Sequence, residues 1–134
     1  MKSVLVLCTG NSCRSQMAEG WLRFYHGNKL EVFSAGIEAH GINPYMKIVM
    51  ESASINIDGH TSNEMKDYEH KHFDYVITVC DHAKANCPYF SNTKNRIHKA
   101  FEDPADATGT EQEKLLIYSR VRDQIQDFCR DLRF

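Results

Sequence analysis

Short unbroken apolar runs alternate along this chain with longer segments in which apolar residues recur every three or four positions. Most of the short runs are rich in valine, isoleucine and leucine, which favours buried β-strands. These predicted strands span residues 3–7, 30–34 and 75–79, and a short fourth strand, with a more polar sequence, is predicted at residues 96–99. The longer segments each present one apolar face, which is typical of helices packed against a sheet. These predicted helices span residues 15–26, 44–53 and 110–132, with a further short helix starting at residues 61–64.

The alternation of strands and helices predicts an α/β fold, in which a four-stranded parallel sheet is flanked by helices on both faces. The chain has 134 residues, the size of one domain, and we expect residues 1–134 to form it. Ligands bind such sheets beyond the carboxyl ends of the strands. Cys8 and Cys80 each follow a predicted strand, so we expect the two thiols to open on the same edge of the sheet.

Composition disfavours several classes of function. The net charge of −2 leaves no basic excess to neutralise phosphates, which argues against a nucleic-acid or anionic-membrane surface. No apolar stretch approaches the ~18 residues of a membrane span, and the opening apolar run does not resemble a signal peptide. We therefore expect a cytoplasmic protein, whose five cysteines are reactive thiols or metal ligands rather than structural disulfides.

The clearest chemical motif follows the first predicted strand, where residues 8–15 read Cys-Thr-Gly-Asn-Ser-Cys-Arg-Ser. A loop of this length can curl around a tetrahedral oxyanion with its N–H groups inward, and an arginine can hold two anion oxygens. The predicted oxyanion loop comprises Thr9, Gly10, Asn11, Ser12, Cys13 and Arg14. Cys8 would be the nucleophile, with a pKa lowered by the positive field and by a hydrogen bond from Ser15. The alternative, a buried structural cysteine, is disfavoured by the flanking strand, helix and glycine.

Two further features allow more than one interpretation. Asp103 precedes a proline, a pair that fits either a surface turn or a loop that carries a general acid. Cys80 and Cys87 flank a polar loop of six residues. They are two unrelated cysteines, a metal-binding pair together with His82 or His98, or partners in thiol exchange.

Residues 8–20, Cys-Thr-Gly-Asn-Ser-Cys-Arg-Ser-Gln-Met-Ala-Glu-Gly, resemble the signature of the thioredoxin-coupled arsenate reductases, which share the fold of the low-molecular-weight protein tyrosine phosphatases. The resemblance covers nearly the whole chain and continues through residues 34–38, 40–41, 43–44, 60–62 and 120–123. It implies that Asp103 is a general acid. It also implies a relay in which Cys8 attacks arsenate, Cys80 releases arsenite, and Cys87 passes the disulfide on to thioredoxin.

The same resemblance implies partners and ions. The expected enzyme binds no cofactor, draws electrons from thioredoxin, accepts phosphate or sulfate as mimics of arsenate, and is a monomer. Cys13 is either a structural thiol or, as in phosphatase relatives, a disulfide partner that protects Cys8. A potassium site is implied at Asn11, Glu19, Ser34 and Asn63. The family usually has an aspartate where this chain has Asn63. Because hard cations prefer carboxylate oxygens, we expect potassium to bind weakly.

Two other functions compete with arsenate reduction. A low-molecular-weight protein tyrosine phosphatase would use the same oxyanion loop and Asp103. However, Gln16 replaces the proline usual in phosphatases, and Cys80 and Cys87 would have no role. A weak phosphatase side activity is compatible with the reductase, since arsenate and phosphate are nearly isosteric. A non-catalytic sensor would bind arsenite or zinc through the three thiols without turnover.

Overall fold

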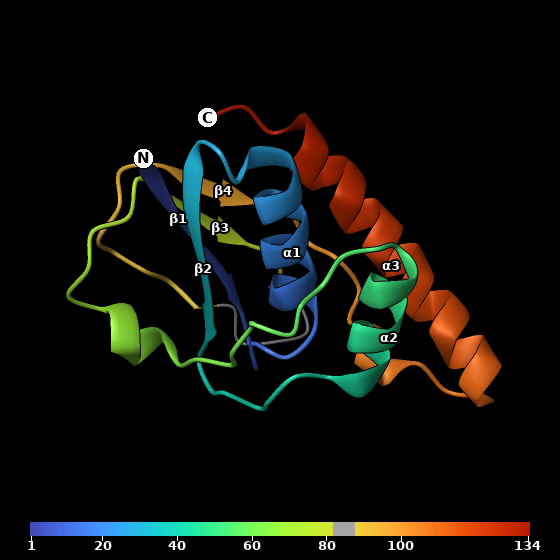
Figure 1. Cartoon of the computed structure of the whole chain (residues 1–134). Coiled ribbons are helices and arrows are strands. Elements are labelled where there is room, and N and C mark those ends of the chain that lie inside the picture. The colour runs from blue at the N-terminus through green and yellow to red at the C-terminus, as the bar shows by residue number, and fades with distance from the viewer. Residues whose placement is uncertain (82–87) are drawn as a thin grey trace.

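The computed structural model describes residues 1–81 and 88–134, and in this part of the chain strands alternate with helices as expected (Figure 1). The strands are β1 (Lys2–Cys8), β2 (Leu30–Gly36), β3 (Tyr75–Thr78) and β4 (Arg96–His98). The α-helices are α1 (Arg14–His26), α2 (Pro44–Ser52) and α3 (Glu111–Asp131), and the 3-10 helices are η1 (Met65–Tyr68) and η2 (Pro104–Asp106). The predicted boundaries hold to within about two residues for all the longer elements.

One boundary differs from the sequence expectation. The short helix predicted to start at residues 61–64 begins at Met65. Its capping box joins Glu64 with Asp67, so that the first N–H groups of η1 find partners there. Thr61 lies three residues before Glu64, which is the spacing of a capping box, but it donates its hydroxyl to the side chain of Asn63 instead. The segment before η1 therefore stays extended, and it forms hydrogen bonds with the loop that follows β1.

The four strands form one parallel sheet in the order β2-β1-β3-β4. The chain moves from β1 to β2 on one side and then crosses to β3 on the other, so the direction of winding reverses at β1. Such a reversal is where ligands bind in open parallel sheets, beyond the carboxyl ends of the strands. Cys8 is the last residue of β1 and pairs with Gly36 of β2, which places it at this reversal.

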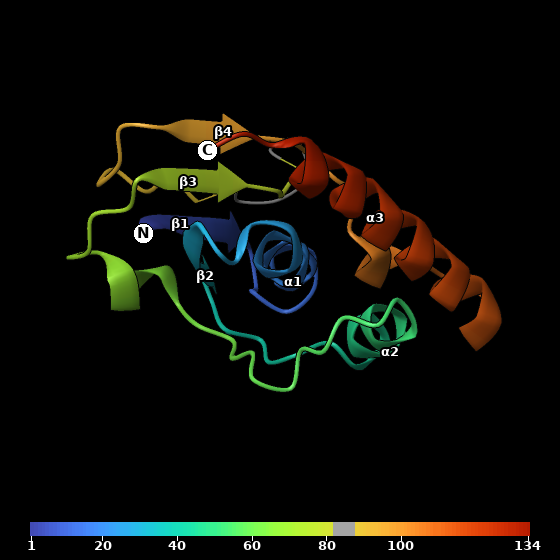
Figure 2. The ribbon, with the colours of Figure 1, turned by 45° about the horizontal axis from the view of Figure 1, so that its top comes forward.

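Side chains of β1 are buried on both faces of the sheet, which explains why the run is apolar throughout. Val4 and Val6 pack with the three α-helices, and Leu5 and Leu7 pack with Phe73 on the opposite face. The α-helices lie together on the first face (Figure 2). The second face is covered by η1 and neighbouring loops.

The predicted fold class is confirmed: the chain forms a single α/β domain with a four-stranded parallel sheet. The three α-helices lie on one face, whereas the other face, where helices were also expected, is covered by the 3-10 helix η1 and loops. Helix α3 begins with a capping box, in which Thr110 and Glu113 each accept a hydrogen bond from the other's backbone N–H. None of the helices in the described part of the chain is long and apolar enough to cross a membrane.

Candidate active site at the end of β1

The loop between β1 and α1 is anchored through its carbonyl groups. The carbonyls of Thr9 and Gly10 accept hydrogen bonds, at 3.1 and 2.9 Å, from backbone N–H groups within residues 38–40. The carbonyl of Ser12 accepts another from the N–H of Asn43 at 3.0 Å. Because these carbonyls point outward, the N–H groups of the loop turn toward its centre. This is the concave nest that binds anions.

Asn11 braces the loop in a conformation that most residues avoid. Its φ of 46° lies in the left-handed region, which asparagine tolerates better than other non-glycine residues. Its side chain donates to Ser15 Oγ at 2.9 Å and accepts from the backbone N–H of Asn63 at 2.7 Å. Its carbonyl accepts from Ser62 and Gln16 at 2.9 and 3.1 Å. These bonds hold the loop against α1 and the segment before η1.

The loop encloses a cavity of about 190 Å³. Cys8 lies at this cavity, only 3% exposed. Besides the loop, the cavity is lined by His40, Asp103 and Ala105. Pockets for drug-sized ligands span roughly 300–1,000 Å³, so this cavity suits a small anion.

The surroundings of the Cys8 thiol shift its pKa in opposite directions. Burial raises its pKa, while the guanidinium of Arg14 and the backbone N–H groups of Thr9 and Ser15 lower it; the Asp103 carboxylate raises it. The net direction is upward, opposite to the lowered pKa expected from the sequence. The sequence showed the charges around the sulfur, but it did not show how completely the fold removes the sulfur from water.

Arg14 and Asp103 meet at the edge of the cavity. Arg14 is 4% exposed. Its guanidinium donates to the carbonyl of Phe101 at 3.0 Å and approaches the Asp103 carboxylate at 3.6 Å. Asp103 also caps η2, because its Oδ1 accepts from the N–H of Ala105 at 3.0 Å. The fold thus brings together the two residues that the motifs predicted to act on an oxyanion, although they are far apart in the sequence.

A wider groove of about 470 Å³ adjoins this point. Its charged lining comprises Arg14, Asp81, Glu102, Asp103 and Asp106. Four of these five side chains are acidic, so the approach to the loop is less positive than the loop itself.

Cys80 follows β3 and reaches the same edge of the sheet as Cys8. The N–H of Val79 donates to the carbonyl of Leu7 at 3.1 Å, which continues the pairing of β3 with β1 up to the two cysteines. Both sulfurs belong to one packed cluster, so the expectation of a shared edge is confirmed. Cys80 is disulfide-bonded, and Cys8 is a free thiol. Cys87, the third member of the predicted relay, lies outside the described residues, as does His82.

The two remaining cysteines are buried free thiols. Cys13 precedes α1, and burial raises its pKa well above the usual value. Cys129 is fully buried on α3, where its sulfur donates to the carbonyl of Ala18 at 3.8 Å. Burial raises the pKa of this thiol as well. Both thiols therefore stay protonated and pack in the core.

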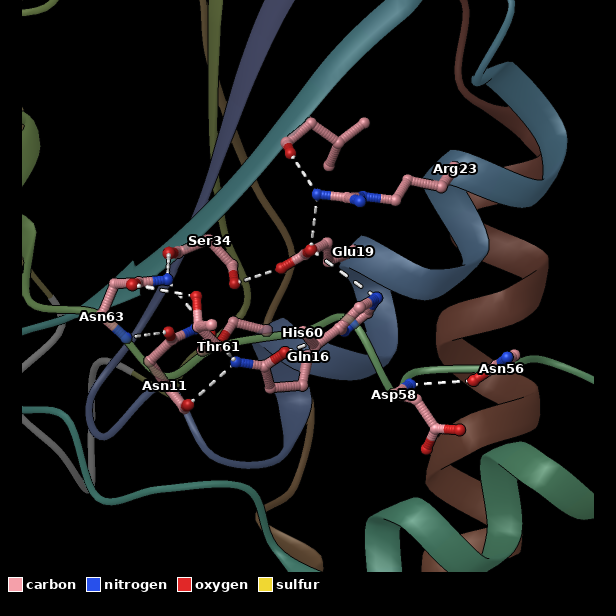
Figure 3. A network of polar contacts seen from close by, with 12 residues as sticks. Asn11, Gln16, Glu19, Arg23, Ser34, Asn56, Asp58, His60, Thr61 and Asn63 are labelled. Atoms are coloured by element: carbon pink, nitrogen blue, oxygen red, sulfur yellow. Dashed lines mark hydrogen bonds and ion pairs between the residues drawn. The ribbon is translucent and has the colours of Figure 1, made fainter.

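Two side chains outside the oxyanion motif support the loop, and for one of them, Gln16, the sequence predicted no such role. Gln16 donates to the carbonyls of Asn11 and Thr61, and its oxygen lies 3.0 Å from His60 Nδ1 (Figure 3). His40 packs so closely on Gly10 that a Cβ at this glycine would come within 2.3 Å of its ring. The available signal for Gln16 was its place directly after Ser15, where phosphatases usually have proline.

The four residues implied as a potassium site lie in one polar network behind the loop (Figure 3). Ser34 donates its hydroxyl to Glu19 at 2.5 Å. The side-chain amide of Asn63 donates to the carbonyl of Ser34 at 3.2 Å, and the backbone N–H of Asn63 donates to Asn11 at 2.7 Å. The network connects the loop with β2 and with the middle of α1.

Comparison with known proteins places these features in a wider group. Residues 3–133 match the family described as low molecular weight phosphotyrosine protein phosphatase. An arsenate reductase of Oceanobacillus iheyensis is 49% identical over 127 residues, 94% of this chain and 91% of that protein. A solved arsenate reductase in the phosphate binding state superposes with a TM-score of 0.81 at 30% identity, covering 96% of this chain and 94% of the other. A thioredoxin-dependent arsenate reductase of Corynebacterium glutamicum gives a TM-score of 0.63 at 28% identity, covering 96% and 63%.

Proposed function

This chain belongs to the low molecular weight phosphotyrosine protein phosphatase family, and we propose that within this family it reduces arsenate to arsenite. The observation that carries the proposal is the second sulfur, Cys80, which the fold brings to the sheet edge of Cys8. A phosphatase needs one nucleophilic sulfur and a water molecule, whereas a two-electron reduction by thiols needs a second sulfur to complete a disulfide. The relatives named arsenate reductase, at nearly half identity over nine tenths of the chain, support the same choice.

The first step is the capture of arsenate by the loop. The inward N–H groups and the Arg14 guanidinium hold the oxyanion over Cys8. The Cys8 sulfur then forms a bond with arsenic as one arsenic–oxygen bond breaks. The oxygen of hydrogen arsenate leaves as water, taking the proton that the thiol releases. Asp103, at the edge of the cavity, is placed to relay that proton to the departing oxygen.

The second step transfers the electrons. The Cys80 thiol attacks the Cys8 sulfur, and the electron pair of the sulfur–arsenic bond moves onto arsenic. Arsenic(V) becomes arsenic(III) and leaves as arsenite with the proton of Cys80, while the two sulfurs lose two electrons together and join in a disulfide. Cys87 then attacks Cys80 and returns Cys8 to the thiol form. A disulfide-bonded Cys80 beside a free Cys8 agrees with the state after this exchange.

The remaining disulfide needs an external dithiol. We propose thioredoxin as this reductant, as in the thioredoxin-dependent relative. The reaction belongs in the cytoplasm, where thioredoxin keeps thiols reduced. Phosphate and sulfate are expected to occupy the loop as mimics of arsenate, and the reaction as drawn needs one chain, so the enzyme is proposed to act as a monomer.

An assay coupled to NADPH tests the proposal. Purified protein is mixed with thioredoxin, thioredoxin reductase and arsenate, and NADPH oxidation is followed for the wild type and for Cys8→Ser, Cys80→Ser and Cys87→Ser. We expect turnover in the wild type and loss of turnover in each variant. Cys129→Ala is the matched control, because that thiol is packed on α3, and it should keep its activity. Turnover in the absence of Cys80 would overturn the relay.

The competing functions give different results. A phosphatase would hydrolyse an aryl phosphate in the Cys80→Ser variant as fast as in the wild type and would consume no NADPH with arsenate. A sensor would bind metal in a fixed ratio without turnover. In the described part of the chain, no group of three or more metal-binding side chains is arranged to hold an ion.

A further inference from the structure

Glu19 is a buried carboxylate behind the oxyanion loop. It lies on α1 with its side chain 5% exposed, and an ionised carboxylate at such depth is costly unless it is compensated. One carboxylate oxygen accepts from Ser34 Oγ at 2.5 Å. The other lies 2.8 Å from a guanidinium nitrogen of Arg23, one turn further along the helix (Figure 3).

The Arg23 guanidinium is fixed on two sides. The nitrogen that meets Glu19 also donates to the carbonyl of Val32 in β2 at 2.8 Å. The side chain is 52% exposed, and through these two contacts its guanidinium joins α1 to β2. A planar guanidinium held in this way is more ordered than an ordinary surface ion pair.

His60 does not supply this charge. Its Nε2 lies 3.6 Å from the Glu19 carboxylate, beyond hydrogen-bond distance. Its other ring nitrogen faces the oxygen of Gln16 at 3.0 Å. The Gln16 amide nitrogen already donates to two carbonyls, so the Gln16 oxygen is the atom that faces His60, and it accepts a hydrogen bond from the Nδ1–H of the ring.

The residues implied as potassium ligands do not fit a cation. The Asn63 side-chain nitrogen donates to the carbonyls of Ser34 and Thr61, at 3.2 and 3.0 Å. An N–H group is thus turned toward the place where a carboxylate would offer an oxygen. The side-chain oxygen of Asn11 is engaged by a backbone N–H at 2.7 Å, and both oxygens of Glu19 are engaged as described.

We propose that Arg23 is the built-in counter-ion of Glu19, so that the oxyanion loop of this protein is held in shape without potassium. The connection to the loop runs through α1: Glu19 and Gln16 lie on the same helix, and Gln16 bonds the carbonyl of Asn11. The proposal concerns how the loop is held and does not depend on which oxyanion is the substrate.

The first test compares cations. The affinity for inorganic phosphate, by calorimetry, and the Tm are measured for the wild type in potassium chloride, sodium chloride and choline chloride at equal ionic strength. We expect both quantities to be the same in the three salts. A rise in phosphate affinity or Tm specific to potassium would show a working potassium site and overturn the proposal.

The second test removes each charge separately. Arg23→Met leaves Glu19 without its partner, so Tm should fall by roughly 5–10 °C and phosphate should bind about tenfold more weakly. Adding Glu19→Gln to that variant removes the stranded charge and should restore most of both losses. If the two substitutions are instead additive, Arg23 has only a packing role and the proposal is wrong.

Arg130→Met is the matched control. Arg130 is 48% exposed and pairs with Asp127 at 3.1 Å on the surface of α3. An exposed pair of this kind contributes little, so its removal should leave phosphate affinity unchanged. A loss of affinity equal to that of Arg23→Met would mean that any arginine has this effect, which would contradict a specific role for Arg23.

Discussion

Asn11 contributes to the oxyanion loop through its side chain and its backbone together, and the two contributions can be separated. Asn11→Ala removes the bonds to Ser15 and Asn63 and places an alanine at a φ of 46°, which costs roughly 1–2 kcal/mol. Asn11→Gly also removes the bonds but accepts this φ without strain. We expect both variants to bind phosphate more weakly, by about tenfold, as calorimetry would show, with only the glycine variant keeping most of the wild-type Tm. Equal Tm values for the two variants would contradict the strained loop.

The buried thiols predict how stability depends on pH. Burial raises the pKa of Cys8, Cys13 and Cys129 in the folded protein, whereas in the unfolded chain they ionise near the ordinary value of ~8.5. The unfolded state therefore loses its protons first as pH rises. Stability is fully present below about pH 8 and declines above it, by up to ~1.4 kcal/mol per thiol and pH unit.

Urea unfolding at several pH values measures this decline. Cys129→Ala removes one of the titrating thiols, so its free energy of unfolding should be lower at neutral pH because of the cavity, but it should fall less steeply above pH ~8.5 than that of the wild type. Parallel curves for the two proteins would show that Cys129 ionises equally in both states. The direction of these pKa values was beyond sequence reasoning, because it depends on burial that no local pattern records.

At the scale of elements, η2 gives Asp103 two separable tasks. The carboxylate caps η2 and also faces Arg14 over the cavity. Asparagine is as good a cap as aspartate, but it cannot relay a proton. Asp103→Asn should therefore leave Tm nearly unchanged and lower kcat for arsenate by roughly 10²–10⁴-fold. Asp103→Ala should lose both activity and about 1 kcal/mol of stability. An asparagine variant with full kcat would remove Asp103 from the chemistry.

Helix ends show where sequence reasoning succeeds and where it fails. The start of α3 was predicted to within one residue, and there Thr110 and Glu113 form a solvent-exposed capping box for which no other element competes. Thr61 has the same spacing to Glu64, yet its carbonyl is taken by Gln16 of another element. This contact, with a residue 45 positions away in the sequence, holds the segment in an extended conformation. Local spacing predicts local bonds only where no distant partner intervenes.

At the scale of the molecule, alternation of strands and helices was enough to predict the sheet, and the rule for strand ends was enough to place Cys8 and Cys80 on one edge. The sequence did not predict the polar network behind the loop. Its members lie on different helical turns or segments, as Gln16, His60 and Arg23 show. Their contacts depend on how α1 packs against β2. The four residues implied by resemblance as potassium ligands lie in this network, where they form hydrogen bonds with one another.

Because the oxyanion loop joins β1, α1, α2 and the segment before η1, filling it should stabilise the whole fold. A ligand that binds only the folded state at 100 times its Kd adds about 2.7 kcal/mol, which for a domain of this size is roughly 5–10 °C in Tm. We expect phosphate or sulfate to raise Tm by this amount, measured by calorimetry against chloride at equal ionic strength. Arg14→Lys keeps the charge but loses the planar pair of donors, and it should lose most of the shift. An equal shift in that variant would mean that the anion stabilises the protein from another surface, and the assignment of the loop as the oxyanion site would not stand.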